Sequence, residues 1–142
     1  MYGVQINAFG KPWDVVETIS LPDPGTPGVG EVVVDMEFSP INPSDLVLMR
    51  GVYGVKPKLP APVGAEGVAR VTKIGSGVTG LKEGDRVLFP RGTSTWLTRS
   101  KVKAEHLFAL PTAADPQQLS MLMVNPPTAY LMLTEYVALK KG

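Results

Sequence analysis

The sequence predicts a mainly β fold, a small barrel or sandwich of short strands followed by a pair of helices at the C-terminal end. Glycine (15) and proline (14) together exceed a fifth of the 142 residues and are spread along the chain, which is typical of short strands joined by turns. Several short segments between these turns are rich in β-branched residues. Beyond Pro111 the apolar residues take helical spacing instead.

The first third of the chain is expected to contain three strands. Residues 4–9 and 14–21 form two short strands with a turn between them, and residues 31–39 form a longer one rich in valine. The segment "PDPGTPGVG" holds three prolines and three glycines, so it is expected to be a loop.

A short helix is predicted over residues 42–51. Asn42 suits the N-cap and Pro43 the first helical position. Asp45 then falls in the first turn, where the helix dipole favours a carboxylate, and Gly51 ends the helix. A long loop with three prolines follows.

The strand pattern returns at residues 67–75, where imperfect alternation indicates burial on both faces or a bulge. Three more short strands are expected at 85–90, 93–100 and 106–111. Two helices are then predicted. The first starts at Asp115-Pro116, and the second runs from Pro127-Thr128 to Lys140-Lys141-Gly142.

Composition excludes several classes of function. The net charge of +1 gives no electrostatic basis for binding nucleic acid or an anionic membrane, and no apolar run approaches the roughly 20 residues of a membrane span. With no cysteine and one histidine, disulfides, iron–sulfur clusters and a structural zinc site are excluded. His106 is expected to be structural or solvent-facing, and the default compartment is the cytosol.

Gly75, Gly77 and Gly80 match the pattern G-x-G-x-x-G of dinucleotide-binding folds. That fingerprint needs a helix directly after the glycines, because the pyrophosphate binds at the N-terminus of that helix. Here another glycine and a strand follow. We therefore expect these glycines to form turns between strands and not a phosphate site.

Four segments together carry a resemblance to a known superfamily: "INPSD" (41–45), "GVYGVKPKLPAPVGAEG" (51–67), "VTKIGSGVTGLKEGDRV" (71–87) and "VNPPTAYLML" (124–133). With these segments the chain resembles the medium-chain dehydrogenase/reductases, whose N-terminal catalytic domain is GroES-like. Within that superfamily it is similar to the zinc-independent, mitochondrial-type 2-enoyl thioester reductases, and quinone oxidoreductases are near relatives. The resemblance runs from about Ala8 to Gly142.

The resemblance also marks where a catalytic zinc is lost. Zinc-dependent members place a cysteine in the turn before the short helix, where this chain has Asn42 to Asp45. They place a histidine before the glutamate of the second motif, where this chain has Ala65 before Glu66. Neither replacement supplies the missing soft or imidazole ligand, so a metal-free relative is expected.

In the enoyl reductases a tyrosine in the loop after the short helix takes the place of the metal, and the matching residue is Tyr53. A phenol with an ordinary pKa near 10 stays protonated at neutral pH, so it can donate to a developing enolate or to Cα. On this interpretation hydride goes from the nicotinamide to Cβ of the conjugated thioester. The alternative is that Tyr53 is only an amphipathic loop residue.

The resemblance implies further site residues. Asn125 matches a position that contacts the nicotinamide half of NADPH, although it also suits the cap of the last helix. Thr128 lies one turn on and reaches the same ligand, and Asn42 matches a position near the tyrosine or acts only as an N-cap. Trp96 matches a tryptophan on the substrate side, or belongs to the core. Glu66 is expected to be a buried structural carboxylate.

The function implied is the catalytic-domain portion of an NADPH-dependent reductase acting on the C=C bond of a 2-enoyl thioester. The alternatives are an NADPH:quinone or enone oxidoreductase, and a non-catalytic GroES-like module that acts by interaction. Residues 1–114 are expected to form the GroES-like domain, a partly open barrel. Residues 115–142 are expected to lead into a Rossmann domain that this sequence does not include.

The expected partner is a small-molecule substrate, an enoyl thioester or a quinone, with no nucleic acid and no membrane. A homodimer is expected for the full-length protein, and the apolar face of the last helix (Tyr130, Leu133, Val137) favours self-association. The compartment is cytoplasmic, or mitochondrial if a targeting segment has been removed. By itself the 142-residue portion is expected to be inactive.

Overall fold

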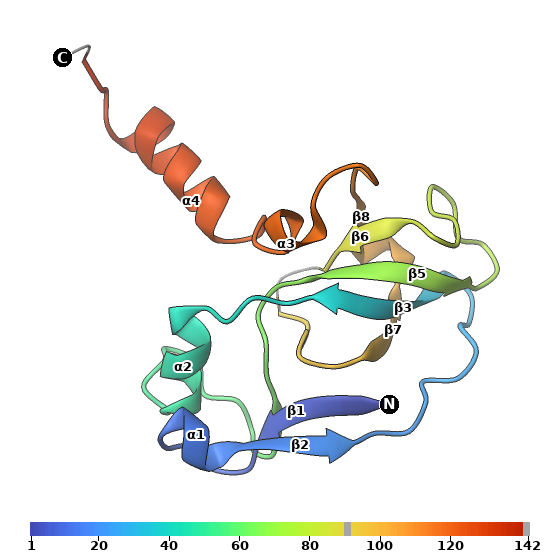
Figure 1. Cartoon of the computed structure of the whole chain (residues 1–142), viewed down its shortest axis with the longest axis horizontal. Coiled ribbons are helices and arrows are strands. Elements are labelled where there is room, and N and C mark those ends of the chain that lie inside the picture. Colours follow the sequence, from blue (N-terminus) through green and yellow to red (C-terminus); the bar gives the residue numbers. More distant parts are fainter. Residues whose placement is uncertain (90–91, 141–142) are drawn as a thin grey trace.

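The computed structural model describes residues 1–89 and 92–140 and shows a mainly β domain with two antiparallel sheets that do not close into a barrel (Figure 1). One sheet has the order β2-β1-β4 and the other the order β7-β3-β5-β6-β8. The strands are β1 (Tyr2–Ile6), β2 (Val16–Ser20), β3 (Glu31–Phe38), β4 (Ala61–Pro62), β5 (Val68–Ile74), β6 (Arg86–Leu88), β7 (Arg99–Lys103) and β8 (Phe108–Ala109).

The larger sheet holds the main core. Strand β3 is its centre, since it pairs with β5 on one side and with β7 on the other. The register between β3 and β5 shifts at Thr72, whose hydroxyl donates to the carbonyl oxygen of Val33 over 3.1 Å. The predicted bulge is therefore present. The buried core of this sheet comprises Val32, Val34, Ala69, Val71, Val87, Phe89 and Leu107.

The smaller sheet packs on the two N-terminal helices and encloses a second core of Ile6, Met49, Ala61 and Val63. Helix α2 (Pro43–Met49) follows the prediction, with Asn42 at the N-cap and a positive φ of 73° at Gly51. Helix α1 (Pro12–Val15) is a single helical turn where a chain turn and the first two residues of the strand 14–21 were expected, so that strand prediction is wrong at its start. Proline at its first position starts it, and β2 follows at once.

The strand predicted at 93–100 is wrong at its start. Strand β7 begins only at Arg99, because the preceding segment crosses from one sheet to the other. There the Trp96 N–H donates to Val63 and its carbonyl accepts from Val4, while the Thr98 carbonyl accepts from Met36 in β3. The strand predicted at 106–111 shrinks to the two residues of β8, since a 3₁₀ turn occupies Ala104–His106.

The two C-terminal helices are shorter than predicted. Helix α3 covers only Pro116–Leu119, with Asp115 as its cap, because the chain then turns and the Met123 N–H donates to Glu66 instead of to a helical carbonyl. Helix α4 (Asn125–Leu131) continues as a π-helical turn over Met132–Tyr136 and ends there, not at Lys140. Lys141 and Gly142 lie outside the described residues.

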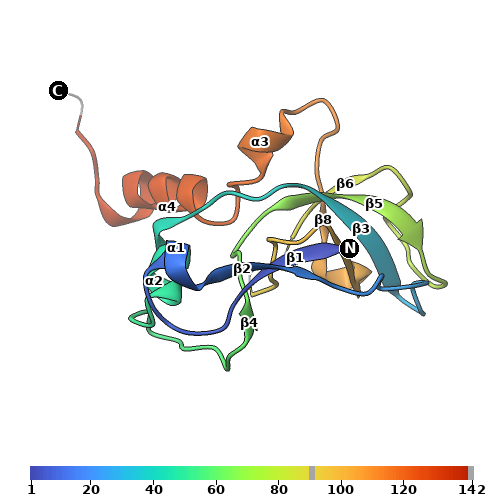
Figure 2. The same ribbon diagram turned by 60° about the horizontal axis from the view of Figure 1, so that its bottom comes forward.

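Helix α4 projects away from both sheets in the two views (Figures 1 and 2). Apolar residues of α4, of its π-helical continuation and directly after it are exposed, among them Tyr130 at 65%, Leu133 at 58% and Val137 at 54%. The segment before it is attached to the domain, because Leu119 packs on Val68 and Leu88. No helix in the described part of the chain is long and apolar enough to cross a membrane.

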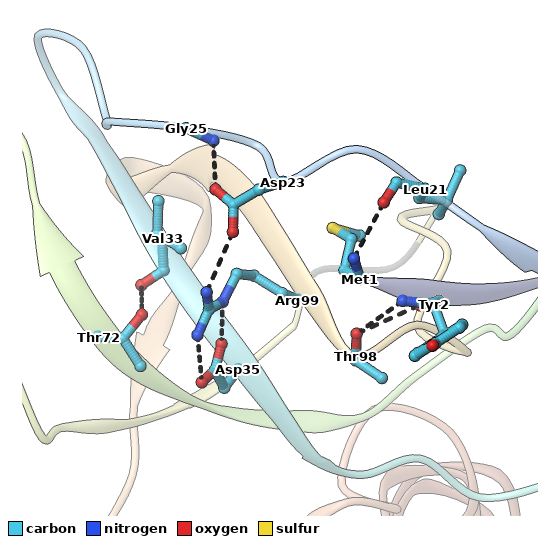
Figure 3. A network of polar contacts seen from close by, with 10 residues as sticks. All are labelled: Met1, Tyr2, Leu21, Asp23, Gly25, Val33, Asp35, Thr72, Thr98 and Arg99. Carbon is cyan, nitrogen blue, oxygen red and sulfur yellow. Dashed lines mark hydrogen bonds and ion pairs between the residues drawn. The ribbon is translucent and has the colours of Figure 1, made fainter.

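Arginine side chains form two ion-pair networks on the larger sheet, in addition to the single pair of Lys103 on β7 with Glu31 on β3. Arg99 of β7 donates to both carboxylate oxygens of Asp35 on β3 and to Asp23 in the loop after β2 (Figure 3). The hydrogen bond from the Gly25 N–H, together with Arg99, lowers the pKa of the Asp23 carboxyl. Glu37 accepts from Arg86 and Arg70, each over 2.6 Å. Arg86 also donates to the carbonyls of Thr112 and Ala114 and so holds the chain that leads to α3.

Candidate active site

The candidate site is organised around Glu66, which precedes β5 and is fully buried. Its Oε1 accepts a hydrogen bond from Asn42 Nδ2 over 2.8 Å, and its Oε2 accepts from the Met123 backbone N–H over 3.0 Å. Asn42 begins α2, and Met123 belongs to the segment between α3 and α4. One carboxylate therefore joins the barrel to two segments that lie far from it in the sequence. This confirms the prediction of a buried carboxylate.

A second amide extends this network to the start of α4. Asn125 Nδ2 donates to Asn42 Oδ1 over 3.2 Å, so Glu66, Asn42 and Asn125 form a continuous chain of side chains. Asn125 is the first residue of α4, and the N-cap is Val124. The interpretation of Asn125 as the helix cap is therefore wrong. Prolines 126 and 127 have no N–H to be capped, and the Asn125 amide is directed to Asn42.

Asp45 supports the same corner of the fold from within α2. Its Oδ2 accepts a hydrogen bond from the Asn42 backbone N–H over 2.7 Å, which fixes the start of the helix. Burial raises the pKa of the Asp45 carboxyl, and the nearby charge of Glu66 raises it further, while the Asn42 hydrogen bond opposes both. Two buried carboxyl groups thus lie close to Asn42.

An apolar groove of about 450 Å³ adjoins the network. Ser39 and Thr95 are among its lining residues, and both donate through their hydroxyls to the Glu66 backbone carbonyl, over 2.7 and 2.8 Å. Trp96 also lines this groove while packing partly on the smaller core, and its indole N–H donates to the Pro40 carbonyl over 3.3 Å. Trp96 is therefore half-buried against the smaller core and also borders an open hollow, and its role on the substrate side stays a prediction.

The remaining residues predicted for the site, Tyr53 and Thr128, are exposed and take no part in the Glu66–Asn42–Asn125 chain of hydrogen bonds. Tyr53 lies in the loop between α2 and β4, and the residue is 37% exposed. Thr128 is one turn into α4, exposed, and its hydroxyl donates to the Val124 carbonyl over 2.6 Å. His106 is exposed at the end of a 3₁₀ turn, as expected for a solvent-facing residue.

The glycine-rich segment has a structural explanation. A Cβ at Gly75 would lie 1.8 Å from the Gly28 carbonyl oxygen, so only glycine permits this approach of the two loops. Gly77 and Gly80 have φ values of 74° and 82°, in the left-handed region that suits turns. Strand β6 follows without an intervening helix. The segment therefore lacks the helix N-terminus on which a dinucleotide fingerprint depends.

The chemistry of the donor set does not suit a catalytic zinc. Ala65 and the Asn42–Asp45 turn offer no sulfur or imidazole ligand, and no group of three His, Cys, Asp or Glu side chains within residues 1–89 and 92–140 is arranged to hold a metal ion. A neutral hydrogen-bond donor is the group that these residues can offer to a substrate oxygen. Tyr53, in the exposed loop between α2 and β4, carries such a donor.

Sequence reasoning missed the backbone link from Glu66 to Met123 and the carbonyl contacts of Ser39 and Thr95. The available signal was the position of Glu66, a lone acidic residue separated only by Gly67 from the strand that begins "VARV". A carboxylate placed there must be buried, and a buried carboxylate requires hydrogen-bond donors. Which donors approach it depends on the tertiary fold.

Comparison with known proteins agrees with this arrangement. Residues 28–120 match the alcohol dehydrogenase GroES-like domain. The mitochondrial enoyl-[acyl-carrier-protein] reductase of Caenorhabditis elegans is 41% identical over 135 residues, covering 94% of this chain and 39% of the relative. The same enzyme of Homo sapiens is 43% identical over 134 residues, which cover 94% of this chain and 36% of the relative. The chain thus spans about two fifths of the length of these curated relatives.

Solved structures share the fold over nearly the whole chain. The mitochondrial 2-enoyl thioester reductase Etr1p/Etr2p heterodimer of Candida tropicalis has a TM-score of 0.88 at 33% identity, covering 99% of this chain and 45% of that one. The Etr1p complex with NADP and crotonyl-CoA has a TM-score of 0.84 at 32% identity, with the same coverage. Escherichia coli quinone oxidoreductase complexed with NADPH has a TM-score of 0.82 at 26% identity, and the match covers 99% of this chain and 42% of that one.

The GroES-like domain match covers more than half of the chain. The chain belongs to the alcohol dehydrogenase GroES-like domain family, within the medium-chain dehydrogenase/reductase superfamily.

Proposed function

We propose that this chain is the catalytic-domain portion of an NADPH-dependent reductase that transfers hydride to the C=C bond of a 2-enoyl thioester. The observation that carries the proposal is the chain Glu66–Asn42–Asn125, which sets a polar amide where α4 leaves the barrel. Support comes from the curated relatives, which are named enoyl reductases, and from the solved complex with NADP and crotonyl-CoA.

The residues present fit the nicotinamide half of such a cofactor. Asn125 uses its NH₂ group on Asn42, and its side-chain carbonyl oxygen has no donor among the described residues. That oxygen is suited to accept from a primary amide, the group that nicotinamide carries. Thr128 lies one turn further along α4, and its hydroxyl oxygen can still accept a hydrogen bond. We assign Asn125, Thr128 and Asn42 to this part of the site, with Asn42 holding Asn125.

Bound NADPH would supply the hydride for Cβ of the substrate. Tyr53 is proposed to manage the accompanying proton, by donating its hydroxyl hydrogen to the thioester oxygen as negative charge develops there, or to Cα. Such a donor stabilises the transition state more than the ground state, because the charge is present mainly in the transition state. A general acid of this kind typically contributes about 10²- to 10⁴-fold in rate.

We place the substrate side at the groove bordered by Trp96. Its lining is mostly apolar and includes Phe38, Ile41 and Leu97, which suits the hydrocarbon part of an acyl thioester. A quinone or enone is the second candidate substrate, favoured by the structural likeness to the NADPH-bound quinone oxidoreductase. Both substrates present a conjugated carbonyl to the same donor.

We also propose a domain boundary at residue 114, with residues 1–114 as the GroES-like catalytic domain and residues 115–142 as the segment that leads toward a nucleotide-binding domain. The exposed apolar face of α4 supports it, since such a face requires a covering surface. We propose a homodimer for the complete protein. For the compartment, the names of the relatives favour the mitochondrion over the cytosol expected first from the sequence.

The test is an NADPH oxidation assay on the complete gene product that carries this chain, with crotonyl-CoA and a naphthoquinone as competing substrates. The proposal predicts a kcat/KM for crotonyl-CoA at least tenfold above that for the quinone, in metal-free buffer with a chelator present. The opposite ratio would assign the protein to the quinone reductases. Absence of NADPH oxidation with both substrates would favour the non-catalytic module.

A further inference from the structure

Glu66 is fully buried, and the proposed chemistry does not use it. Neither of its side-chain partners carries a positive charge, since one is the amide of Asn42 and the other the backbone N–H of Met123. Burying a carboxylate among neutral groups is costly, and an apolar side chain would satisfy the packing at a lower cost. We therefore look for the role of Glu66 in the groups that it holds in place, the Asn42 amide and the Met123 backbone.

The carboxylate determines the direction of the hydrogen bonds beyond it. An ionised carboxylate can only accept, so Asn42 must turn its NH₂ group toward Glu66 Oε1. The Asn42 carbonyl oxygen then faces the other way and accepts from the NH₂ group of Asn125. The group of Asn125 that remains is its carbonyl oxygen. The orientation of two amides is thus set by one acceptor at the buried end.

The same carboxylate fixes the backbone near Asn125. Its second oxygen accepts the Met123 N–H, two residues before Asn125, over 3.0 Å. This contact occurs where helix α3 has ended and α4 has not begun, so helical hydrogen bonds do not fix the N–H there. Glu66 therefore controls both the position of the backbone and the orientation of the Asn125 amide.

We infer that Glu66 is a positioning residue, which acts through Asn42 and Met123 to present the carbonyl oxygen of Asn125, as an acceptor, to the carboxamide of the nicotinamide. The inference rests on the proposed function, because it assigns a role toward the cofactor proposed there. Glu66 itself touches neither cofactor nor substrate. Glu66 should therefore affect the binding of the nicotinamide half of the cofactor and not the binding of the adenosine half.

The substitution Glu66→Gln reverses the hydrogen-bond direction with almost no change in shape. A glutamine has one acceptor oxygen, which the Met123 N–H requires, so its NH₂ group faces Asn42. Asn42 must then present its oxygen to Gln at position 66 and its NH₂ to Asn125. Asn125 then turns its oxygen toward Asn42 and its NH₂ toward the carboxamide NH₂ of the cofactor. Two donors face each other there, so this hydrogen bond is lost.

The experiment measures binding to the complete protein by titration calorimetry with NADPH and with 2′-phospho-ADP-ribose, which lacks the nicotinamide. E66Q is expected to weaken NADPH binding by roughly tenfold, the equivalent of one lost hydrogen bond, and to leave 2′-phospho-ADP-ribose binding within about twofold. Equal weakening of both ligands would show that Glu66 only stabilises the fold, and would overturn the inference.

A second substitution supplies the rescue. In E66Q/N42D, the carboxylate at position 42 accepts from the glutamine NH₂ on one side and from Asn125 on the other, so Asn125 regains its original orientation. NADPH affinity should return to within about twofold of the unmodified protein. The single variant N42D faces two carboxylates toward each other and should bind NADPH more weakly than the double variant.

The outcomes separate this inference from the proposed function. If the unmodified complete protein does not bind NADPH, the proposed function fails and the inference fails with it. If it binds NADPH but E66Q has no effect, or N42D does not restore binding in the E66Q protein, only the inference is overturned. Should E66Q alone be too unstable to titrate, the double variant decides, because weak NADPH binding by a folded double variant would contradict the role.

Discussion

The ion-pair group of Glu37, Arg70 and Arg86 gives a prediction whose size can be worked out from the structure. Glu37 lies on β3 with its side chain 20% exposed, and it contacts Arg86, which is 8% exposed, and Arg70, which is 39% exposed. Replacing Glu37 by glutamine keeps the shape of the side chain and removes its charge. The buried Arg86 guanidinium then loses its counter-ion.

Removing one partner of a buried ion pair typically destabilises a protein by about 3–5 kcal/mol, because the other charge stays buried. Arg86 retains the carbonyls of Thr112 and Ala114, so we expect a loss near the lower end, about 3 kcal/mol. The matched control is Arg70→Met. Arg70 is more exposed and solvent screens its charge, so this control should cost about 1 kcal/mol or less.

The pH dependence of the Glu37 contribution provides a second readout. Burial alone would raise the pKa of the Glu37 carboxyl, but the hydrogen bonds and charges of Arg86 and Arg70 outweigh it, so the pKa lies below its ordinary value of 4.5. A lowered carboxyl pKa stabilises the folded state above the unfolded value, and this stability is lost as the pH falls through the folded pKa. The difference between the original chain and E37Q should therefore be complete at pH 7 and shrink below about pH 4.5.

The assay is urea unfolding of E37Q, R70M and the unmodified chain, followed by circular dichroism at pH 7 and at several acidic pH values. The reasoning would be refuted if E37Q cost no more than R70M at pH 7. It would also be refuted if the E37Q deficit were unchanged at pH 3, where the carboxylate advantage should be much reduced.

Two further predictions concern stability. Phe89 is fully buried in the core of the larger sheet, so Phe89→Ala should reduce the free energy of unfolding by about 3–5 kcal/mol in urea titrations, and a loss below 1 kcal/mol would mean that this core is not packed as described. The pKa of Asp45 is raised by burial, so the folded state binds the proton more tightly and loses stability as the pH rises from 3.8 through the folded pKa. Asp45→Asn keeps an acceptor for the Asn42 N–H. Urea unfolding at a series of pH values should show the original chain losing stability relative to D45N as the pH rises through that window. If the free energies of unfolding of the two chains changed in parallel with pH, the raised pKa would be contradicted.

The elements that sequence reasoning predicted well are those with strong local signals. The helix from Pro43 is fixed by Asn42, Asp45 and Gly51, each of which has a local reason to be there. Strands β3 and β5 follow from their runs of β-branched residues. Gly75, Gly77 and Gly80 could be assigned to turns, and not to a phosphate site, because the sequence after them predicts no helix.

The errors occurred where tertiary contacts override local pattern. The segment before Arg99 has strand-like residues, but its hydrogen bonds alternate between two sheets, so no regular ladder forms before β7. Residues 115–125 have helical spacing, yet the helix stops after Leu119, and the Met123 N–H is used by Glu66. Neither partner lies nearby in the sequence, so no local pattern could reveal these contacts.

The candidate site was predicted residue by residue, but its connections were not. Asn42, Asn125 and Glu66 were each singled out, and the structure joins them in one chain of hydrogen bonds. The expected capping role of Asn125 was wrong, because Asn125 is the first residue of α4, Val124 is its N-cap, and the Thr128 N–H donates to the Val124 carbonyl. The roles of Tyr53, Thr128 and Trp96 in the reaction remain predictions.

The most direct test of the central claim, that a phenol replaces the metal ion in this barrel, is the turnover of Tyr53→Phe in the complete protein. Stopped-flow measurement of NADPH oxidation with saturating crotonyl-CoA should show at least about a hundredfold lower rate, with the Kd for NADPH unchanged within about twofold. Glutamate or aspartate would alter the charge of this loop, whereas phenylalanine removes only the hydroxyl group. A rate for Y53F within a few-fold of the original would contradict the claim.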